Sequence, residues 1–239
     1  KVIGGVHYQG LEMVDVMLGT GNDAFTIDST ADGALTVLHG GGGDDHIIIN
    51  GGGGIGSPLV VYGDTSQDGA RYSSQPGRIA DMAIAFTNPG NDVLDASSAT
   101  ETVILYGGFG ADTILGGAGG DHIAGGSGKD LLQGADGNDI LYGDSGFNLD
   151  PHADQRLSVV TIATPTLASF DPLLPEADII HGDAGEDVLI GDFGSVQHEM
   201  GVERIETTDD IQQIETTVHF AGGDDQLQGG QDKDLLFGG

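Results

Sequence analysis

Apolar residues recur at a nine-residue interval between residues 107 and 142, which fits neither a helical period nor the simple alternation of a half-buried strand. The same place in four successive units is held by Ile114, Ile123, Leu132 and Leu141. Each of these side chains follows an aspartate by two positions. Three residues such as 113–115 suffice for one short strand, whose middle side chain points to the opposite face from its neighbours. The pattern predicts short strands with these apolar side chains inside.

The full unit reads Gly-Gly-x-Gly-x-Asp-x-apolar-x, with places one to nine. Residues 107–115, 116–124 and 125–133 match it throughout, and residues 134–142 depart only by Ala135 at place two. Glycines at places one, two and four let the backbone enter left-handed conformations that a β-carbon would penalise. The first six residues therefore form a tight turn with inward carbonyls, and two units make one coil of 18 residues.

Stacked coils place each residue next to the one 18 positions later, so Asp112 adjoins Asp130 and Asp121 adjoins Asp139. Two such carboxylates repel each other unless a cation lies between them. Calcium takes six to eight oxygen ligands and satisfies both carboxylates and the free carbonyls. The pattern predicts that calcium forms part of the core, that the metal-free segment is largely disordered, and that binding is coupled to folding.

Composition supports a cation as the main partner. The chain of 239 residues contains 44 glycines and no cysteine, and its formal net charge is −31. Disulfides and thiolate metal sites are thereby excluded, and oxygen is the abundant ligand type. Nucleic acid and anionic membranes would be repelled. The sequence contains no apolar run of membrane-spanning length, so no membrane insertion is expected.

The unit recurs outside the regular block, and the chain is interpreted as one continuous solenoid. Its expected parts are irregular rungs at 1–106, regular units at 107–146, an insertion at 147–177, units at 178–194, a second insertion at 195–220 and units at 221–239. The strands expected in the first part are Leu35–Leu38, His46–Ile49, Leu59–Tyr62, Ala83–Phe86 and Thr102–Tyr106. A chain that begins without Met and ends within a repeat is expected to be a segment of a longer protein.

The two insertions are expected to decorate one face of the solenoid. In the second, Ile205-Glu-Thr-Thr recurs as Ile214-Glu-Thr-Thr, which fits either a hairpin turned at Asp209-Asp210 or two rungs without a metal turn. Outward-facing residues such as His46 and His122 are expected in solvent rather than as zinc ligands.

No catalytic constellation stands out. The stretch 198–202 has Val202 where the zinc-protease helix needs its second histidine, and the glycine-rich stretch 125–130 lacks the residues of a phosphate loop. The segment is therefore expected not to be an enzyme. A flexible acidic linker is the competing interpretation of the composition, but a linker does not require an apolar residue two places after each aspartate.

These repeats resemble the repeats-in-toxin (RTX) family of calcium-binding proteins. The resemblance implies an all-β, right-handed parallel β-roll or β-helix solenoid with several calcium ions in its glycine-rich turns. Carried over, the place-six ligands are Asp112, Asp121, Asp130, Asp139, Asp178, Asp187, Asp225 and Asp234, with Asp23, Asp45 and Asp92 in the looser rungs. The carbonyl ligands belong to Gly108, Gly110, Gly117, Gly119, Gly126, Gly128 and Gly137. Asp144 and Asn148 depart from the pattern.

The resemblance further implies type I secretion and folding outside the cell, where calcium is abundant. The expected function is a calcium-rigidified structural or adhesive segment of a large extracellular bacterial adhesin-like protein, which forms fibres or contacts cell-surface or matrix partners. The alternative is the folding and secretion module of an exported enzyme such as a protease, lipase or polysaccharide-modifying enzyme. Ice binding is a third hypothesis, which rests on one Gly-Thr-Gly-Asn-Asp turn at 19–23.

Overall fold

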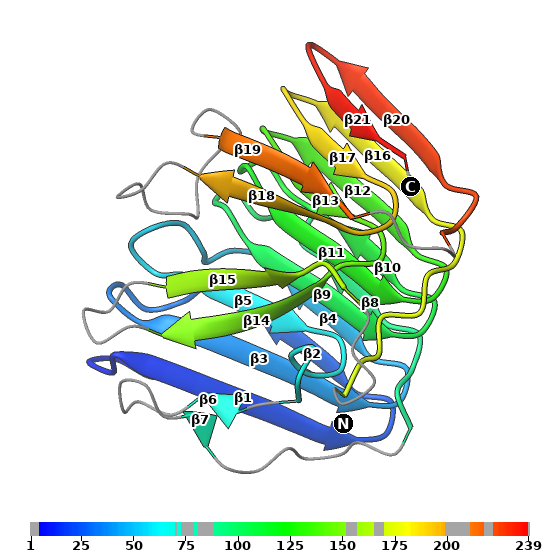
Figure 1. The fold of residues 1–239 in the computed structure, drawn as a ribbon. Coiled ribbons are helices and arrows are strands. Elements are labelled where there is room, and N and C mark those ends of the chain that lie inside the picture. The colour runs from blue at the N-terminus through cyan, green and yellow to red at the C-terminus, as the bar shows by residue number, and fades with distance from the viewer. Residues whose placement is uncertain are drawn as a thin grey trace.

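Two parallel β-sheets face each other, and the described part of the polypeptide alternates between them (Figure 1). The computed structural model describes residues 5–69, 71–72, 79–80, 88–151, 157–164, 170–198, 211–217 and 222–238. In these residues every element is a strand, and one strand from each sheet forms one rung of the solenoid. This arrangement confirms the all-β parallel solenoid.

The eight-stranded sheet has the order β1-β3-β5-β9-β11-β13-β17-β21. Its strands are Met13–Thr20 (β1), Leu35–Gly42 (β3), Leu59–Tyr62 (β5), Ile104–Phe109 (β9), His122–Ser127 (β11), Ile140–Tyr142 (β13), Val188–Ile190 (β17) and Leu235–Phe237 (β21). The seven-stranded sheet has the order β2-β4-β8-β10-β12-β16-β20. Its strands are Ala24–Ile27 (β2), His46–Ile49 (β4), Val93–Asp95 (β8), Thr113–Leu115 (β10), Leu131–Asp136 (β12), Ile179–Ala184 (β16) and Gln226–Gln231 (β20).

Most of the strands expected in the first part of the chain are present. β4 and β5 have the expected bounds, Leu35–Leu38 lies within β3, and Thr102–Tyr106 overlaps β9. The fifth, Ala83–Phe86, lies outside the described residues. Thr113 pairs with Leu131 and Ile123 with Leu141, which confirms the 18-residue coil in the regular block.

The main core lies between the two sheets. Ile114, Ile123, Leu132 and Leu141 are fully buried in it, as the nine-residue pattern predicts. Each rung therefore adds about one large aliphatic side chain from each sheet, and the core runs as a continuous line along the solenoid. Burial of such side chains stabilises the fold by roughly 1.5–3 kcal/mol each.

The outer faces of the two sheets differ. On the seven-stranded sheet, β10 alternates between partly exposed and buried positions, as expected of a sheet with one face in solvent. On the eight-stranded sheet, all residues of β5, β13 and β17 are buried. A second apolar cluster on this outer face includes Tyr62, Tyr106 and Tyr142.

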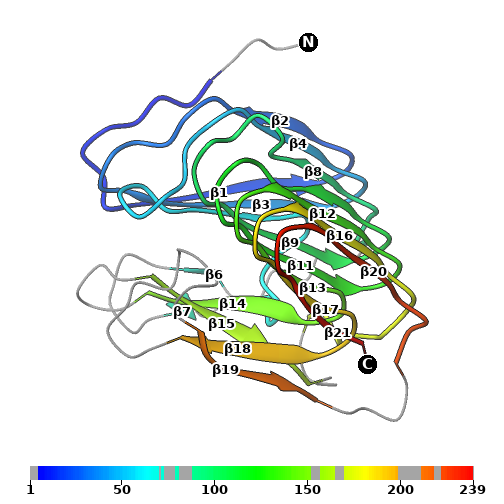
Figure 2. The same ribbon diagram turned by 90° about the horizontal axis from the view of Figure 1, so that it is seen from above.

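Antiparallel hairpins cover the outer face of the eight-stranded sheet (Figure 2). Gly146–Pro151 (β14) pairs with Leu157–Ile162 (β15), and Gly194–His198 (β18) pairs with Ile211–Thr216 (β19). The short pair Arg71–Tyr72 (β6) and Ile79–Ala80 (β7) lies on the same side of the molecule. Phe147 and Leu149 of β14 complete the second apolar cluster.

Two details of the hairpin layer differ from the sequence interpretation. Ile214 pairs with Val196 rather than with a residue near Ile205, so the hairpin of the second insertion forms between the two ends of that insertion. The stretch 199–210, with Asp209-Asp210, lies outside the described residues. His122 is 7% exposed rather than solvated, because the β18–β19 hairpin covers this face and His198 lies 6.0 Å away between ring centroids.

Candidate metal centre

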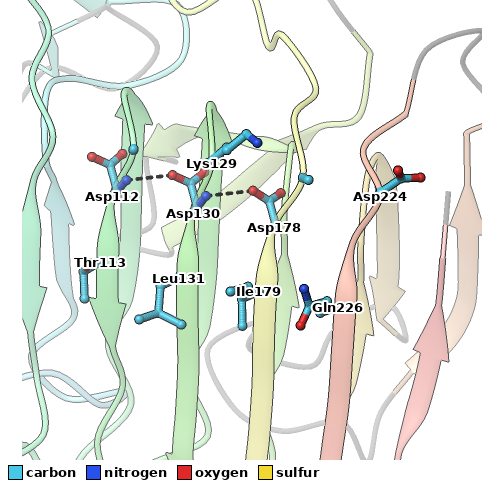
Figure 3. A pocket seen from close by; sticks show the side chains of 11 residues that line it. Asp112, Thr113, Lys129, Asp130, Leu131, Asp178, Ile179, Asp224 and Gln226 are labelled. Atoms are coloured by element: carbon cyan, nitrogen blue, oxygen red, sulfur yellow. Dashed lines mark hydrogen bonds between the residues drawn. The ribbon is translucent and has the colours of Figure 1, made fainter.

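The place-six aspartates form a hydrogen-bonded ladder along one edge of the solenoid. We define this first edge as the turns that lead from the eight-stranded to the seven-stranded sheet. The backbone N–H of Asp112 donates to Oδ1 of Asp130 (2.8 Å), and the N–H of Asp130 donates to Oδ1 of Asp178 (2.8 Å; Figure 3). The same bond joins each successive pair of Asp23, Asp45, Asp92, Asp112, Asp130, Asp178 and Asp225.

A shorter ladder occupies the second edge, where turns lead from the seven-stranded back to the eight-stranded sheet. Its N–H to Oδ1 bonds join Asp121, Asp139, Asp187 and Asp234 in sequence. Asp121 begins the ladder, and its Oδ1 accepts from the N–H of Val103 at 2.8 Å. The structure thus brings all the aspartates singled out in the sequence onto two edges, with Asp112 beside Asp130 and Asp121 beside Asp139.

The second carboxylate oxygen of most ladder aspartates is buried and has no hydrogen-bond partner. These Oδ2 atoms belong to Asp45, Asp92, Asp112, Asp130 and Asp178 on the first edge and to Asp139 and Asp187 on the second. A buried carboxylate oxygen without a partner is costly, and a cation removes that cost. Asp121 differs, because its Oδ2 accepts from the N–H of Gly117 in its own turn at 2.7 Å.

Each unpartnered oxygen occupies the space where a β-carbon would lie on the place-one glycine of its turn. We call this space the glycine cradle. A β-carbon built on Gly125 would lie 2.2 Å from Oδ2 of Asp130 and 2.7 Å from the carbonyl oxygen of Gly143 in the next rung. Gly134 shows the same arrangement on the second edge, with Oδ2 of Asp139 at 2.2 Å and the carbonyl oxygen of Gly182 at 2.9 Å. Carboxylate and carbonyl oxygens therefore converge where successive turns stack.

The glycines were expected to adopt a left-handed backbone at places one, two and four, and only some of them do. Gly126 and Gly128, at places two and four, have φ of 102° and 133°, so a left-handed turn requires them. Gly125 at place one lacks a left-handed φ and is needed for the space that the carboxylate occupies. Gly117 and Gly119 also lack a left-handed φ, because their turn stacks on the irregular loop before Val103.

Burial and mutual repulsion make the ladder carboxylates hard to ionise without a counter-charge. Burial raises the pKa of Asp139 and of Asp178 to about 9, and the neighbouring carboxylates add to the effect. The pKa of Asp112 is raised well above its usual value, first by burial and then by the charge of Asp130. A divalent cation favours the ionised form, so these side chains and a cation stabilise each other.

Three turns of the first edge are expanded by insertions that separate place two from place three. The turn that begins at Gly143-Asp144 ends at Asp178, and the chain returns to the turn at Pro175, which bridges to Gly128. The other two expanded turns run from Gly63-Asp64 to Asp92 and from Gly191-Asp192 to Asp225.

The sequence interpretation treated the turn after Gly143 as a decaying repeat with Asn148 at place six. The structure instead places Asn148 in β14, within the hairpin layer, and supplies the sixth place from Asp178. The sequence pattern does not single out Asp64, and it marks Asp144 only as a departure from the repeat. The signal that marks them is a Gly-Asp pair in place of Gly-Gly at the start of each expanded turn.

The arrangement fits calcium. An open pocket of about 380 Å³ runs beside Asp112, Asp130 and Asp178, and its rim includes Lys129 and Asp224 (Figure 3). Within the described part of the chain, no three His, Asp or Glu side chains converge on one point. A site here therefore combines one or two carboxylates with backbone carbonyls, an all-oxygen set that suits calcium rather than zinc.

Comparison with protein-family models matches the four-copy model of the RTX calcium-binding nonapeptide repeat. The matched segments are residues 86–123, 104–132, 115–149, 175–195 and 221–239. No match was found among curated proteins or among solved structures. Among the described residues, no helix is long and apolar enough to cross a membrane.

Proposed function

We propose that this chain, which belongs to the RTX calcium-binding nonapeptide-repeat family, is an extracellular structural segment that becomes a rigid β-roll when calcium binds. The repeats bind calcium ions. The proposal adds that the ions bind at the two aspartate ladders, that the rigid roll serves adhesion or fibre formation, and that the segment has no catalytic role.

One observation carries the proposal: buried carboxylate oxygens without hydrogen-bond partners repeat from rung to rung along both edges. In a solenoid each rung contacts mainly its neighbours, so an interaction repeated between rungs stiffens the whole length. When bound, calcium supplies positive charge that neutralises the stacked acids. The chain supplies the ladder that holds the carboxylates and the glycine turns that admit the metal.

An extracellular location accords with the calcium requirement and with the chain's chemistry. A net charge of −31 disfavours the compact state when no cation is bound, through self-repulsion. A protein that must stay unfolded during export and fold afterwards is served by this dependence, because calcium is scarce inside cells and abundant outside. Self-association or contact with cell-surface or matrix partners would then follow folding.

A calcium titration of the purified chain, followed by far-ultraviolet circular dichroism, tests the proposal. We expect a cooperative gain of β signal between zero and a few millimolar calcium, reversed by a chelator, and a much weaker response to magnesium, which demands a more rigid octahedral geometry. A β spectrum that is the same with calcium and with chelator contradicts the proposal.

The competing hypothesis is a folding and secretion module of an exported enzyme. Both hypotheses predict the same calcium response, so the flanking sequence of the gene must distinguish them. A hydrolase or zinc-protease motif next to this segment favours the enzyme module, and extended arrays of further repeats favour the structural segment.

A further inference from the structure

The first two expanded turns each contain a second buried carboxylate, at place two. Asp64 is 1% exposed and Asp144 is 0% exposed. Regular turns of the same edge have Gly108 and Gly126 at this place. A carboxylate has therefore been introduced where an insertion opens the turn.

Each of these carboxylates has one oxygen engaged and one oxygen without a partner. Oδ2 of Asp64 accepts from the N–H of Phe109 at 3.0 Å, and its Oδ1 is buried with no hydrogen-bond partner. Oδ1 of Asp144 accepts from the N–H of Glu176 at 3.3 Å, and its Oδ2 is buried with none. Two unpartnered carboxylate oxygens in the interior require a positive ligand or a proton.

The strongest like-charge neighbour of each carboxylate is the place-six aspartate of its own turn. That neighbour is Asp92 for Asp64 and Asp178 for Asp144. Both partners also have a buried, unpartnered Oδ2. A β-carbon built on Gly63 or Gly143, the residue directly before Asp64 or Asp144, would lie 2.3 Å from Oδ2 of Asp92 or Asp178. Each of the two turns thus contains two neighbouring buried carboxylates whose combined charge matches one divalent cation.

We propose that Asp64 and Asp144 are additional calcium ligands, each holding a cation together with the place-six aspartate of its own turn, Asp92 or Asp178. The inference rests on the proposed calcium-dependent function and deepens it. Asp64 and Asp144 stand where the chain leaves the turn, and Asp92 and Asp178 stand just after it returns. A cation held by each pair would therefore join the two ends of the insertion, which together form its neck.

Two other buried aspartates nearby differ from Asp64 and Asp144 in their hydrogen bonding. Asp171 lies near the end of the insertion at 147–177 and accepts hydrogen bonds from the hydroxyls of Tyr106 and Ser127 and from the N–H of Leu173 (2.9 Å). Asp192, in the third expanded turn, accepts from the N–H of Gly223 at 2.7 Å, which closes that neck directly. Asp64 and Asp144 lack such a set of donors. The carboxyl group of Asp192 lies within hydrogen-bonding reach of Asp144 and adds a further acidic group there.

A cation at each neck would couple calcium binding to the hairpin layer. The chain between Asp144 and Asp178 contributes β14, whose Phe147 and Leu149 pack on the eight-stranded sheet, and β15, which pairs with β14. Closing a long loop by a metal clip lowers the entropy cost of docking the segment within it. Calcium would therefore organise the covering layer as well as the solenoid.

The test compares Asp64→Asn, Asp144→Asn and the double variant with the wild-type chain. Asp183→Asn is the matched control, because Asp183 also stands at place two but in an uninterrupted turn, where its Oδ2 accepts from Gln133 Nε2 at 2.6 Å. Bound calcium is counted by equilibrium dialysis, and the calcium midpoint of folding is measured by circular dichroism. We expect one ion fewer in each single variant, two fewer in the double variant, and a midpoint raised at least about tenfold.

The direction in which the calcium midpoint of folding shifts distinguishes two roles for Asp64 and Asp144. Each is either a calcium ligand or a buried charge that only destabilises the fold. Removing an unfavourable charge would leave the number of ions unchanged and lower the midpoint or leave it unchanged, and this result overturns the inference. A variant that stays unfolded at a hundredfold excess of calcium over the wild-type midpoint also overturns it, because mass action rescues a weakened ligand. A wild-type chain that binds no calcium refutes the proposed function itself.

Discussion

The two edges of the solenoid differ in how many of their turns have a place-six aspartate. The first edge has an aspartate at place six in every rung from Asp23 to Asp225, including the rungs whose turns are expanded. The second edge has its ladder only from Asp121 onward. Before that point the turns at 28–34, 50–58 and 96–103 connect the sheets without a place-six aspartate.

The rungs without second-edge aspartates still stack in register. Phe25 pairs with Ile47, and Ile47 pairs with Leu94, all through parallel backbone ladders. In the turns themselves, the Asn50 N–H donates to Ile27 O at 2.8 Å, and its side-chain amide donates to Asp28 Oδ1 at 2.9 Å. Strand pairing in these rungs therefore does not require a second-edge ladder. Where the second-edge ladder is present, it adds buried carboxylate oxygens without hydrogen-bond partners, at Asp139 and Asp187.

The largest effect is expected from pH in the metal-free protein. Burial raises the pKa of Asp92 to about 7 and that of Asp139 and Asp178 to about 9, against about 4 in an unfolded chain. The folded state then binds more protons than the unfolded state, so metal-free stability is greatest below about pH 4 and is lost as pH rises through 7 to 9.

Circular dichroism after thorough metal removal, recorded from pH 9 down to pH 4, checks this expectation. The β signal should grow as the pH falls. With calcium present the dependence should reverse, because calcium needs the ionised carboxylates. A metal-free β signal that grows with rising pH would show that the ladder carboxylates are not the groups that oppose folding.

Removing two first-edge carboxylates is the next largest perturbation. The double variant Asp112→Asn/Asp130→Asn keeps the shape of the side chains and removes charge from adjacent rungs. We expect the calcium midpoint of folding to rise at least about tenfold. The matched control is Asp28→Asn/Asp95→Asn, which makes the same charge change away from both ladders. Equal shifts in the two variants would mean that overall charge, and not the ladder, sets the midpoint.

A glycine-to-alanine pair compares the crowded first edge with the open part of the second. In Gly125→Ala the new β-carbon would meet Oδ2 of Asp130 at 2.2 Å, whereas a β-carbon at Gly56 meets nothing within 4 Å. Thermal unfolding in calcium should show a loss of about 1–3 kcal/mol for Gly125→Ala. Gly56→Ala should leave the stability nearly unchanged. Similar losses at both sites would show that the carboxylate beside Gly125 is not the reason this position needs glycine.

The smallest effect is expected at Ala135, the one non-glycine at place two of the four regular units at 107–142. Its φ is 79°, a conformation that costs an L-residue roughly 1–2 kcal/mol. Ala135→Gly relieves this strain but gives the unfolded chain more freedom, at roughly 0.4–1 kcal/mol. Denaturant unfolding in calcium should therefore show a gain of between about 0 and 1.6 kcal/mol. A clear loss of stability would mean that the Ala135 side chain makes contacts that outweigh its strain.

The regular part of the fold could be predicted because its signals are local. Aspartate, glycine and apolar residue recur at fixed places, and the resulting spacing fixes which side chains stack, as for Asp112 with Asp130. The nine-residue unit also predicts that Ile114 lies inside. The prediction that His122 is exposed to solvent was wrong for the same reason. The residues of its own unit do not indicate that a hairpin distant in sequence covers that face.

The expanded turns could not be predicted because their two halves are far apart in sequence. Gly143-Asp144 and Asp178 form one turn, but more than 30 residues separate them. If Asp144 is assigned to place two, an insertion can follow it, and the place-six aspartate can come from a residue much later in the chain. The spacing of about 47 residues from Asp45 to Asp92, from Asp130 to Asp178 and from Asp178 to Asp225 was the available sign that one turn had been opened in each interval.

The most direct test of the account is a crystal structure of the chain grown in calcium, with anomalous difference maps recorded at a long wavelength. The account predicts peaks between successive aspartates along the first edge, and along the second edge only among the rungs from Asp121 to Asp234. Anomalous peaks absent from both ladders, or equally frequent at the turns 28–34 and 50–58, would contradict it.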